Sequence, residues 1–354
     1  MKLRVILLLL LQPALMLVLV ACSGDPAQLP AYTPYPTYTT VPPTATPYPT
    51  YTSVLSTATQ VPPTPAPTAT QVPPTAIATP TPTPTVTAVT DGVVDITRLP
   101  IGDGRVSTRA LSGNVWSCQT TFQDRLIHGG PWLNGDGTFD YTKKVVVPGE
   151  VSWPSSFDVT VVGSLRMLTG NSLPIHTTGA FPIPRNSEAY SYDPNPNGIR
   201  SQTLSIELPA TPTLADRPLC LRMGPIGIML TGGLFFNALD AAGVDAVAHE
   251  VLDACDGHPQ GQGKYHYHNL TPCVDDVESG HSELKGYAFD GFGIYGLRGE
   301  GGQLLTNDDL GACHGHTHTV AWDSETLDLF HYHATWEYPY TVGCYRGTPV
   351  SLPR

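Results

Sequence analysis

A long segment rich in proline and threonine limits where this chain can form a folded domain. Residues 26–90 contain no Asp, Glu, Lys or Arg, and short units such as Gln60–Thr64 recur as Gln71–Thr75. A stretch of this composition cannot bury a core, and its prolines favour an extended polyproline II conformation. At about 3.1 Å per residue, the segment reaches at most about 200 Å. We therefore expect a disordered stalk that holds a folded domain away from its attachment point.

The residues before this segment predict export. Lys2 and Arg4 precede an apolar run at residues 5–20. A basic start, an apolar run and a small-residue cleavage site are typical of a secretory signal peptide. Cys22 stands directly after Leu19-Val20-Ala21, an arrangement that resembles a bacterial lipoprotein signal. The resemblance implies that Cys22 is lipidated and anchors a secreted protein to the bacterial cell membrane or surface. A plain signal peptide and an anchor helix are the alternatives.

We therefore expect a signal peptide at 1–21, lipidated Cys22 with its disordered linker at 22–90, and one compact domain at 91–354; two subdomains that meet at a seam near 209–218 are the alternative. The net charge of the whole chain is −12 at pH 7, and nearly all acidic residues lie in the domain. This charge argues against nucleic acid or an anionic membrane surface as a partner and suits cations better. The sequence names no protein partner.

Six cysteines in the domain predict three disulfide bonds, because an even count in an exported domain is typical of a disulfide framework. Six cysteines allow fifteen pairings, and the sequence alone does not choose among them. A cysteine metal site is the rival interpretation, but CxxC spacing is lacking. The pairing that we favour is Cys118 with Cys220, Cys255 with Cys273, and Cys313 with Cys344.

The domain has the texture of short strands and turns, with Gly and Pro scattered among Thr, Val and Tyr. The best helix candidate runs from about Val244 to Cys255. We expect a mainly β, disulfide-braced domain with few helices and a sandwich-like sheet core. The expected strands are Lys143–Val147, Phe157–Val162, Thr203–Leu208, Ile226–Leu230, Tyr287–Phe289, Thr319–Trp322 and Leu329–Tyr332.

The strongest chemical signal is the spacing of the histidines. In an extended strand, residues two apart point to the same face, so a strand with alternating histidines presents them on one side. Imidazole is the commonest transition-metal ligand in proteins, and we expect the tracts to converge in one metal site for copper or zinc. Seven of the twelve histidines fall in three such tracts: His266 and His268; His314, His316 and His318; His331 and His333.

The order of motifs along this half of the chain resembles the bacterial YHYH-domain family, whose name describes the tetrapeptide Tyr265–His268. The resemblance covers roughly residues 160–348 and also rests on Cys255–Pro259, Asp290–Gly293 and Cys313–Gly315. It implies a secreted, metal-dependent domain and gives no substrate.

Within this pattern we rank the expected metal ligands as His266, His268, His314 and His333, followed by His331 and His258. The tract at 314–318 is richer in histidine than the usual family form, so we expect His316 and His318 to be extras. Asp256, Asp290 and Glu283 are candidates to orient or join the ligands, and Asp290 or Asp256 is the candidate general base.

His249 and Glu250 lie on the expected helix, where Asp253 takes the place of the second histidine of an HExxH zinc-protease motif. A buried pair between His249 and Asp253 is the preferred interpretation. The sequence contains no Gly-x-Ser-x-Gly motif, and disulfide bonding of all six domain cysteines would leave no thiol nucleophile, which disfavours covalent catalysis.

Three functions follow from these features. The preferred one is a cell-surface lipoprotein that binds copper or zinc through a histidine cluster. The second is an extracellular metalloenzyme, either a zinc hydrolase or a copper oxidase, that uses the same cluster. The third is an adhesion or scaffold module with structural histidines, which predicts that the histidines are spread apart.

Overall fold

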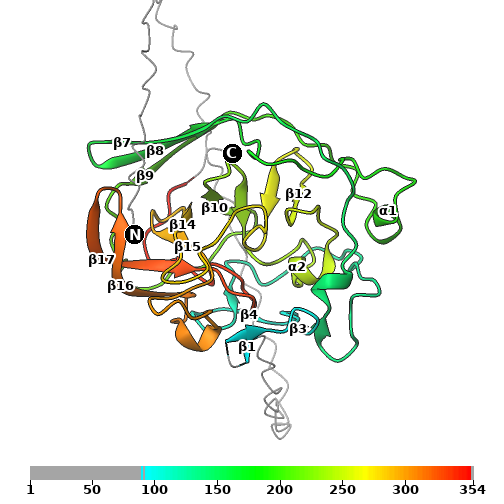
Figure 1. Ribbon diagram of the computed structural model, residues 1–354, viewed down its shortest axis with the longest axis horizontal. Coiled ribbons are helices and arrows are strands. Elements are labelled where there is room, and N and C mark those ends of the chain that lie inside the picture. The colour runs from blue at the N-terminus through cyan, green and yellow to red at the C-terminus, as the bar shows by residue number, and fades with distance from the viewer. Residues whose placement is uncertain (1–88, 91, 352–354) are drawn as a thin grey trace, which may run out of the picture. The chain divides into compact units, whose positions relative to one another are not determined.

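One eight-stranded sheet is the largest element of the computed structural model, which describes residues 89, 90 and 92–351 (Figure 1). Its strand order is β12-β13-β11-β10-β14-β15-β17-β16. In chain order these strands are β10 (Pro225–Met229), β11 (Leu234–Phe236), β12 (Gly257–Pro259), β13 (Tyr265–Tyr267), β14 (Leu284–Ala288), β15 (Gly293–Tyr295), β16 (Gly315–Trp322) and β17 (Glu325–His333).

The sheet consists of two similar halves that meet where β10 pairs antiparallel with β14. Each half begins with a hairpin, adds one strand parallel to the hairpin, and ends with an antiparallel partner of that strand. Ile228 lies opposite Tyr287 at the junction. On either side of this pair, the Leu230 N–H donates to the Lys285 carbonyl and the Phe289 N–H donates to the Ile226 carbonyl, both at 2.9 Å. The two halves are therefore related by an approximate two-fold axis through the Ile228–Tyr287 pair.

The correspondence extends to single residues. His258 lies opposite His266 in one half, and His316 lies opposite His331 in the other. Each hairpin also contains one register shift at the same step of its first strand. Figure 1 shows the half with β16 and β17 on the left and the half with β12 on the right. The fold therefore builds the same arrangement of strands and histidines twice.

A three-stranded antiparallel sheet packs against the second half. It contains β7 (Phe157–Val162), β8 (Leu165–Gly170) and β9 (Leu204–Pro209). Arg166 on β8 has a side chain only 2% exposed, and its guanidinium lies 4.7 Å from the ring centroids of both Tyr287 and Trp322. The same group donates to both carboxylate oxygens of Asp323, at 2.8 and 2.9 Å. Two sheets therefore share a core on this side.

The remaining elements are short. The small pairs are β1 (Val89–Thr90) with β2 (Val93–Val94), β3 (Leu99–Pro100) with β6 (Thr138–Phe139), and β4 (Val106–Ser107) with β5 (Val115–Trp116). The α-helices are α1 (Ala189–Tyr192) and α2 (Ala246–His249), and 3₁₀ turns occur at Tyr141–Lys143 and Asn307–Asp309. The expectation of a mainly β domain with few helices is confirmed.

Most expected strands are present near their expected positions. Two local predictions were wrong, one of a strand and one of the length of a helix. Residues 143–147 form no strand, because the chain turns at Lys143 and Val147 makes a single bridge to Asp253. The expected helix at 244–255 is one turn long and ends at His249. Beyond it, the Asp253 carboxylate accepts the N–H groups of Cys255 and Gly257, and this local turn replaces helical hydrogen bonds.

Three disulfide bonds join Cys118 to Cys220, Cys255 to Cys273, and Cys313 to Cys344, which confirms the favoured pairing. The expected signal peptide at 1–21, Cys22 and almost all of the expected linker at 22–90 lie outside the described residues. Within the described part of the chain, none of the helices has the length and apolar character needed to span a membrane.

The contact between the two sheets can be tested at Arg166. Arg166→Met keeps the apolar stem and removes the ion pair and hydrogen bonds, so we expect a loss of about 1–2 kcal/mol in the free energy of unfolding, measured by urea denaturation. The control is Arg98→Met, which breaks an exposed pair with Asp136 and should leave the unfolding midpoint nearly unchanged. Equal midpoints for both variants would contradict this role for Arg166.

Candidate metal centre

We expected the histidine tracts to converge in one metal site, but in the structure they do not. Among the described residues, the structure gathers two separate groups of imidazoles. The first group contains His258, His266 and His268, and the second contains His281, His316, His318, His331 and His333. In each group the candidate ligand atoms lie within 4.8 Å of one another. The two halves of the sheet contribute one group each, with His281 reaching the second group from the segment before β14.

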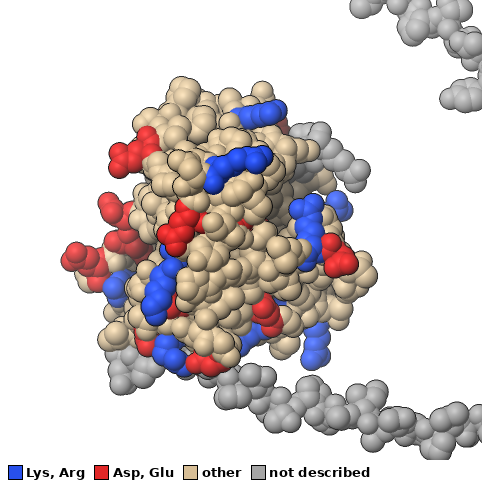
Figure 2. Space-filling model, turned by 90° about the vertical axis from the view of Figure 1, so that its right-hand side faces the viewer, with Lys and Arg blue, Asp and Glu red and all other residues tan. Residues whose placement is uncertain are grey.

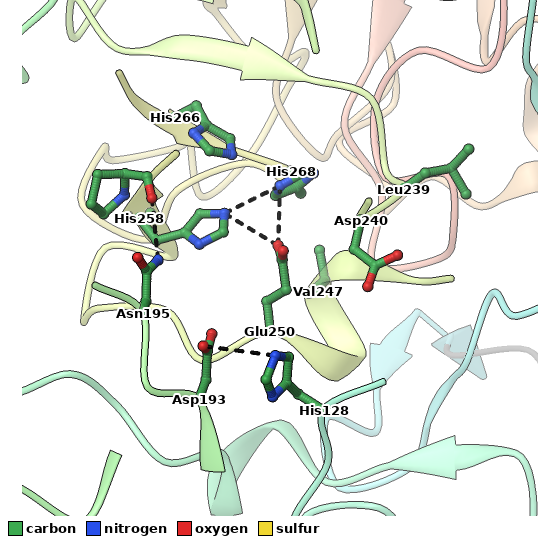
Figure 3. Close-up of polar contacts among 12 residues, drawn as sticks. His128, Asp193, Asn195, Leu239, Asp240, Val247, Glu250, His258, His266 and His268 are labelled. Carbon is green, nitrogen blue, oxygen red and sulfur yellow. Dashed lines mark hydrogen bonds and ion pairs between the residues drawn. The ribbon is translucent and has the colours of Figure 1, made fainter. Parts of the chain in front are cut away.

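The first cluster, His258 with His266 and His268, lies where β12 and β13 pair (Figure 3). All three histidines are buried, with at most 5% of each residue exposed. The Nε2 atoms of His258 and His268 are 3.4 Å apart. The Glu250 carboxylate lies 3.2 Å from the first of these nitrogens and 3.3 Å from the second. Three imidazoles therefore converge, and the Glu250 carboxylate lies against two of them.

Strand alternation explains how β13 orients its side chains. Tyr265 and Tyr267 point to one face, where the Tyr265 hydroxyl donates to Asp253 at 2.9 Å. His266 and His268 point to the other face. Their Nδ1 atoms bond to backbone carbonyl oxygens, of Lys264 at 3.1 Å and of Asn237 at 2.6 Å respectively. With Nδ1 donating, each Nε2 is directed toward the cluster, where it carries a lone pair in the neutral ring and a proton in the charged ring.

Glu250 reaches the imidazoles because α2 ends one residue before it. The Asp245 carboxylate caps this helix by accepting the N–H groups of Val247 and Ala248. At the other end, the half-buried Lys144 ammonium donates to the carbonyls of Val247 and Glu250, and Glu250 itself is extended. The chain direction therefore changes at Glu250 and brings its carboxylate against His258 and His268.

The charges in the first cluster depend on one another. Burial alone would raise the pKa of Glu250, but the charges and hydrogen bonds of His258 and His268 hold that pKa well below its ordinary value. Burial opposes protonation of His258, yet the Glu250 carboxylate raises the pKa of His258 above its ordinary value. Burial and the neighbouring imidazoles lower the pKa of His266 well below its ordinary value. The Glu250 carboxylate and the His258 imidazole therefore stabilise each other's charged forms.

The first cluster opens onto a cleft of about 670 Å³. Glu250 and all three histidines line it, together with several uncharged polar side chains from neighbouring loops. Figure 3 shows Asn195 and Asp193 below His258, on the same side of the first cluster. The volume is in the range of sites that take small ligands. The polar lining includes Gln119, Gln123, Asn195, Asn197, Gln260 and Gln262.

The second cluster, His281 with His316, His318, His331 and His333, corrects the ranking of the 314–318 tract. His316 and His318, expected to be extras, belong to this group, while His314 does not. His314 occupies a turn with a φ of 69°, and its Nε2 accepts or donates a 3.1 Å hydrogen bond with the Thr335 hydroxyl. Asp256 holds the corresponding turn position in the other half, with a φ of 55°. The residue after the cysteine thus shapes a turn in both halves.

The aspartates expected to act as bases lie elsewhere. The Asp290 carboxylate accepts the hydroxyl of Tyr332 at 2.6 Å and backbone N–H groups of Arg346 and Gly347. Asp256 accepts the Tyr141 hydroxyl at 2.7 Å and the Asn269 amide at 2.8 Å. Neither belongs to a histidine group, and neither does Glu283, which is exposed. The carboxylate at the first cluster is Glu250.

The expected pair between His249 and Asp253 is not formed, because the helix ends before Asp253. His249 instead contacts the Asp103 carboxylate at 2.9 Å and the His128 carbonyl at 2.7 Å. A further grouping of His176 with Cys255 and Cys273 is set aside, because these two cysteines form a disulfide bond. The sequence analysis did not select His281 as a ligand. It also gave Glu250 no role at the first cluster, although the His249-Glu250 dipeptide had drawn attention to this residue.

Comparison with known proteins supports the resemblance drawn from the motifs. Residues 205–303 match the family model described as YHYH protein, so this part of the chain is a YHYH-type domain. The match covers β10–β15, that is, the first half of the large sheet and the hairpin of the second half, and it ends before β16. No curated protein and no solved structure matches the chain.

The His249–Asp103 contact generates a prediction about pH. Burial opposes protonation of His249, but its bond to Asp103 raises the His249 pKa above 6.5. Burial likewise opposes ionisation of Asp103, but the bond to His249 lowers the Asp103 pKa below 3.8. The stabilisation by this pair is therefore greatest between pH 3.8 and 6.5. It is lost as pH rises through the His249 pKa and as pH falls through the Asp103 pKa.

We expect Asp103→Asn to lower the pKa of His249, measured by NMR titration of its ring protons. Asp158→Asn, at an exposed position of β7, is the control that should leave it unchanged. An unshifted His249 titration in Asp103→Asn would show that the carboxylate does not set this pKa.

Proposed function

We propose that this domain binds a transition metal ion, copper or zinc, at the first cluster. The observation that carries the proposal is the convergence of His258, His266 and His268 beside Glu250 in a buried position. Three imidazoles with a carboxylate nearby are a donor set typical of zinc and copper sites. The hydrogen bonds from Nδ1 of His266 and His268 to backbone carbonyls supply the orientation that such ligands need.

We also propose that the protein works outside the cytoplasm, attached to the bacterial membrane or cell surface by a lipid on Cys22. The basic and apolar start of the chain and the position of Cys22 support this localisation. The three disulfides are typical of an oxidising compartment. In this arrangement the proline-rich linker separates the metal site from the membrane. Figure 2 shows acidic and basic side chains mixed on the visible face, which suits neither nucleic acid nor an anionic membrane.

A second candidate function is metal-dependent catalysis, and the cleft is the observation that favours it. A catalytic metal site keeps one position open for water or substrate, and the first cluster borders a cavity of about 670 Å³. With zinc bound, a metal-activated water would supply the nucleophile, and Glu250, which lies against His258 and His268, would take its proton. An adhesion module with structural histidines predicts scattered imidazoles, so their clustering weighs against that alternative.

Elemental analysis tests the proposed metal site. The full-length chain, purified without a polyhistidine tag, should contain copper or zinc. The variant His266→Ala/His268→Ala should lose about one metal equivalent, because it removes two of the three imidazoles. Circular dichroism establishes whether the variant keeps its fold.

The control is His128→Ala/His176→Ala, which removes two histidines that belong to neither histidine cluster. Its metal content should equal that of the wild type. A wild-type protein that holds no metal after reconstitution, or a folded His266→Ala/His268→Ala variant with unchanged metal content, would refute the site.

A further inference from the structure

The second cluster is a separate group of donors that the first site does not explain. Its five imidazoles come from three places in the chain: the segment before β14, strand β16 and strand β17. His331 and His333 are fully buried, while His281, His316 and His318 are half-buried. The five candidate ligand atoms all lie within 4.8 Å of one another. Such convergence is far denser than an ordinary strand with satisfied histidines requires.

The strand pair β16–β17 aims these rings at a common space. The register sets His316 opposite His331, and strand alternation brings His318 and His333 to the same face. The His331 Nδ1–H donates to the Leu329 carbonyl at 2.9 Å, and the His333 Nδ1–H donates to the Gly296 carbonyl at 2.7 Å. Both Nε2 lone pairs therefore face inward. The His331 Nε2 is buried and has no hydrogen-bond partner among the described residues.

The contacts inside this group call for a cation. The Nε2 atoms of His281 and His333 are 3.1 Å apart, and those of His316 and His318 are also 3.1 Å apart. Two imidazole nitrogens at this distance repel each other unless a proton or a metal lies between them. Each pair can share one proton, but the inward-facing His331 nitrogen would still lack a partner. A single metal ion gives all of these lone pairs a common acceptor of electron density.

The two clusters share a framework and differ in their donors. His258, His266 and His268 occupy the same strand positions as His316, His331 and His333. The first cluster adds the Glu250 carboxylate, whereas the second adds the imidazoles of His281 and His318. The carboxylate of Glu300 is 67% exposed and lies 3.6 Å from the Nδ1 of His318, on the outer side of that ring. The donors of the second cluster are therefore nitrogen atoms only.

This difference has a chemical consequence. Among divalent first-row ions, copper binds a given nitrogen site most tightly, and imidazole is a preferred ligand for it. A carboxylate adds a hard oxygen donor that zinc accepts readily in mixed sites. We infer that His281, His316, His318, His331 and His333 form a second metal site, independent of the first, that selects copper through its nitrogen donors. The half-buried histidines His281 and His318 provide the route by which the ion reaches the buried pair.

The test uses full-length protein in which His266→Ala/His268→Ala has removed the first cluster. This protein should bind one Cu²⁺ ion, and its electron paramagnetic resonance spectrum should carry splitting from several imidazole nitrogens. Adding His316→Ala/His318→Ala should weaken Cu²⁺ binding by at least about 100-fold, because two ligands are lost. The matched control is Thr317→Ala/Thr319→Ala, which changes outward-facing residues of the same strand and should leave the affinity unchanged.

A second variant guards against unfolding. His281 lies outside the strands, so His281→Ala should keep the sheet intact, weaken Cu²⁺ binding by about 10-fold or more and alter the nitrogen splitting. Unchanged copper affinity in both histidine variants would overturn the inference. Copper binding that disappears with the first cluster alone would overturn it as well and leave the proposed first site standing. Conversely, copper held only by the second cluster would support the inference even if the first site binds nothing.

Discussion

The antiparallel pairing of β10 with β14 is the constraint on which the rest of the structure depends. Ile228 and Tyr287 face each other at this junction, and each hairpin extends away from it in the same manner. Each hairpin then accepts a parallel strand whose histidines alternate with buried aromatic side chains. Because the two halves are built alike, the fold places a group of imidazoles near each end of one sheet instead of collecting all of them in one centre.

The orientation of the imidazoles has one physical cause that occurs in both halves. Four histidines, His266, His268, His331 and His333, bond through Nδ1 to a backbone carbonyl oxygen. Main-chain oxygens are fixed by the strands, so these rings are held before any ion arrives. The hydroxyls on the opposite face complete the pattern, since Tyr267 contacts Thr231 and Tyr332 contacts Asp290. What differs between the halves is the residue that closes each cluster: the Glu250 carboxylate at the end of α2 in the first, and the imidazoles of His318 on β16 and of His281, before β14, in the second.

The sequence predicted the fold class and the disulfides of this domain better than the arrangement of its histidines. Gly and Pro scattered among Thr, Val and Tyr indicated a mainly β domain, and the even number of domain cysteines indicated three disulfides. The alternating histidines were expected to converge in one site, whereas they form two groups. The internal repeat was hidden in the sequence because the paired strands differ in length. In the first half, β12 and β13 have three residues each, whereas the corresponding β16 and β17 have eight and nine residues. His314 was ranked too high as a metal ligand because it occupies a turn. Its position after Cys313 corresponds to that of Asp256 in the first half, and only the positive φ of both residues reveals this correspondence. Glu250 was undervalued because its approach to His258 depends on where α2 ends.

The central claim is that the histidines of this YHYH-family domain are metal ligands rather than structural residues. Crystals of the full-length protein soaked with zinc and copper, with anomalous diffraction measured at both absorption edges, test it most directly. The account predicts an anomalous peak at each cluster, about 2.0–2.1 Å from the Nε2 atoms that face it, with copper in the cluster that contains His331. Crystals that diffract well and show no anomalous peak within bonding distance of either cluster would contradict the account.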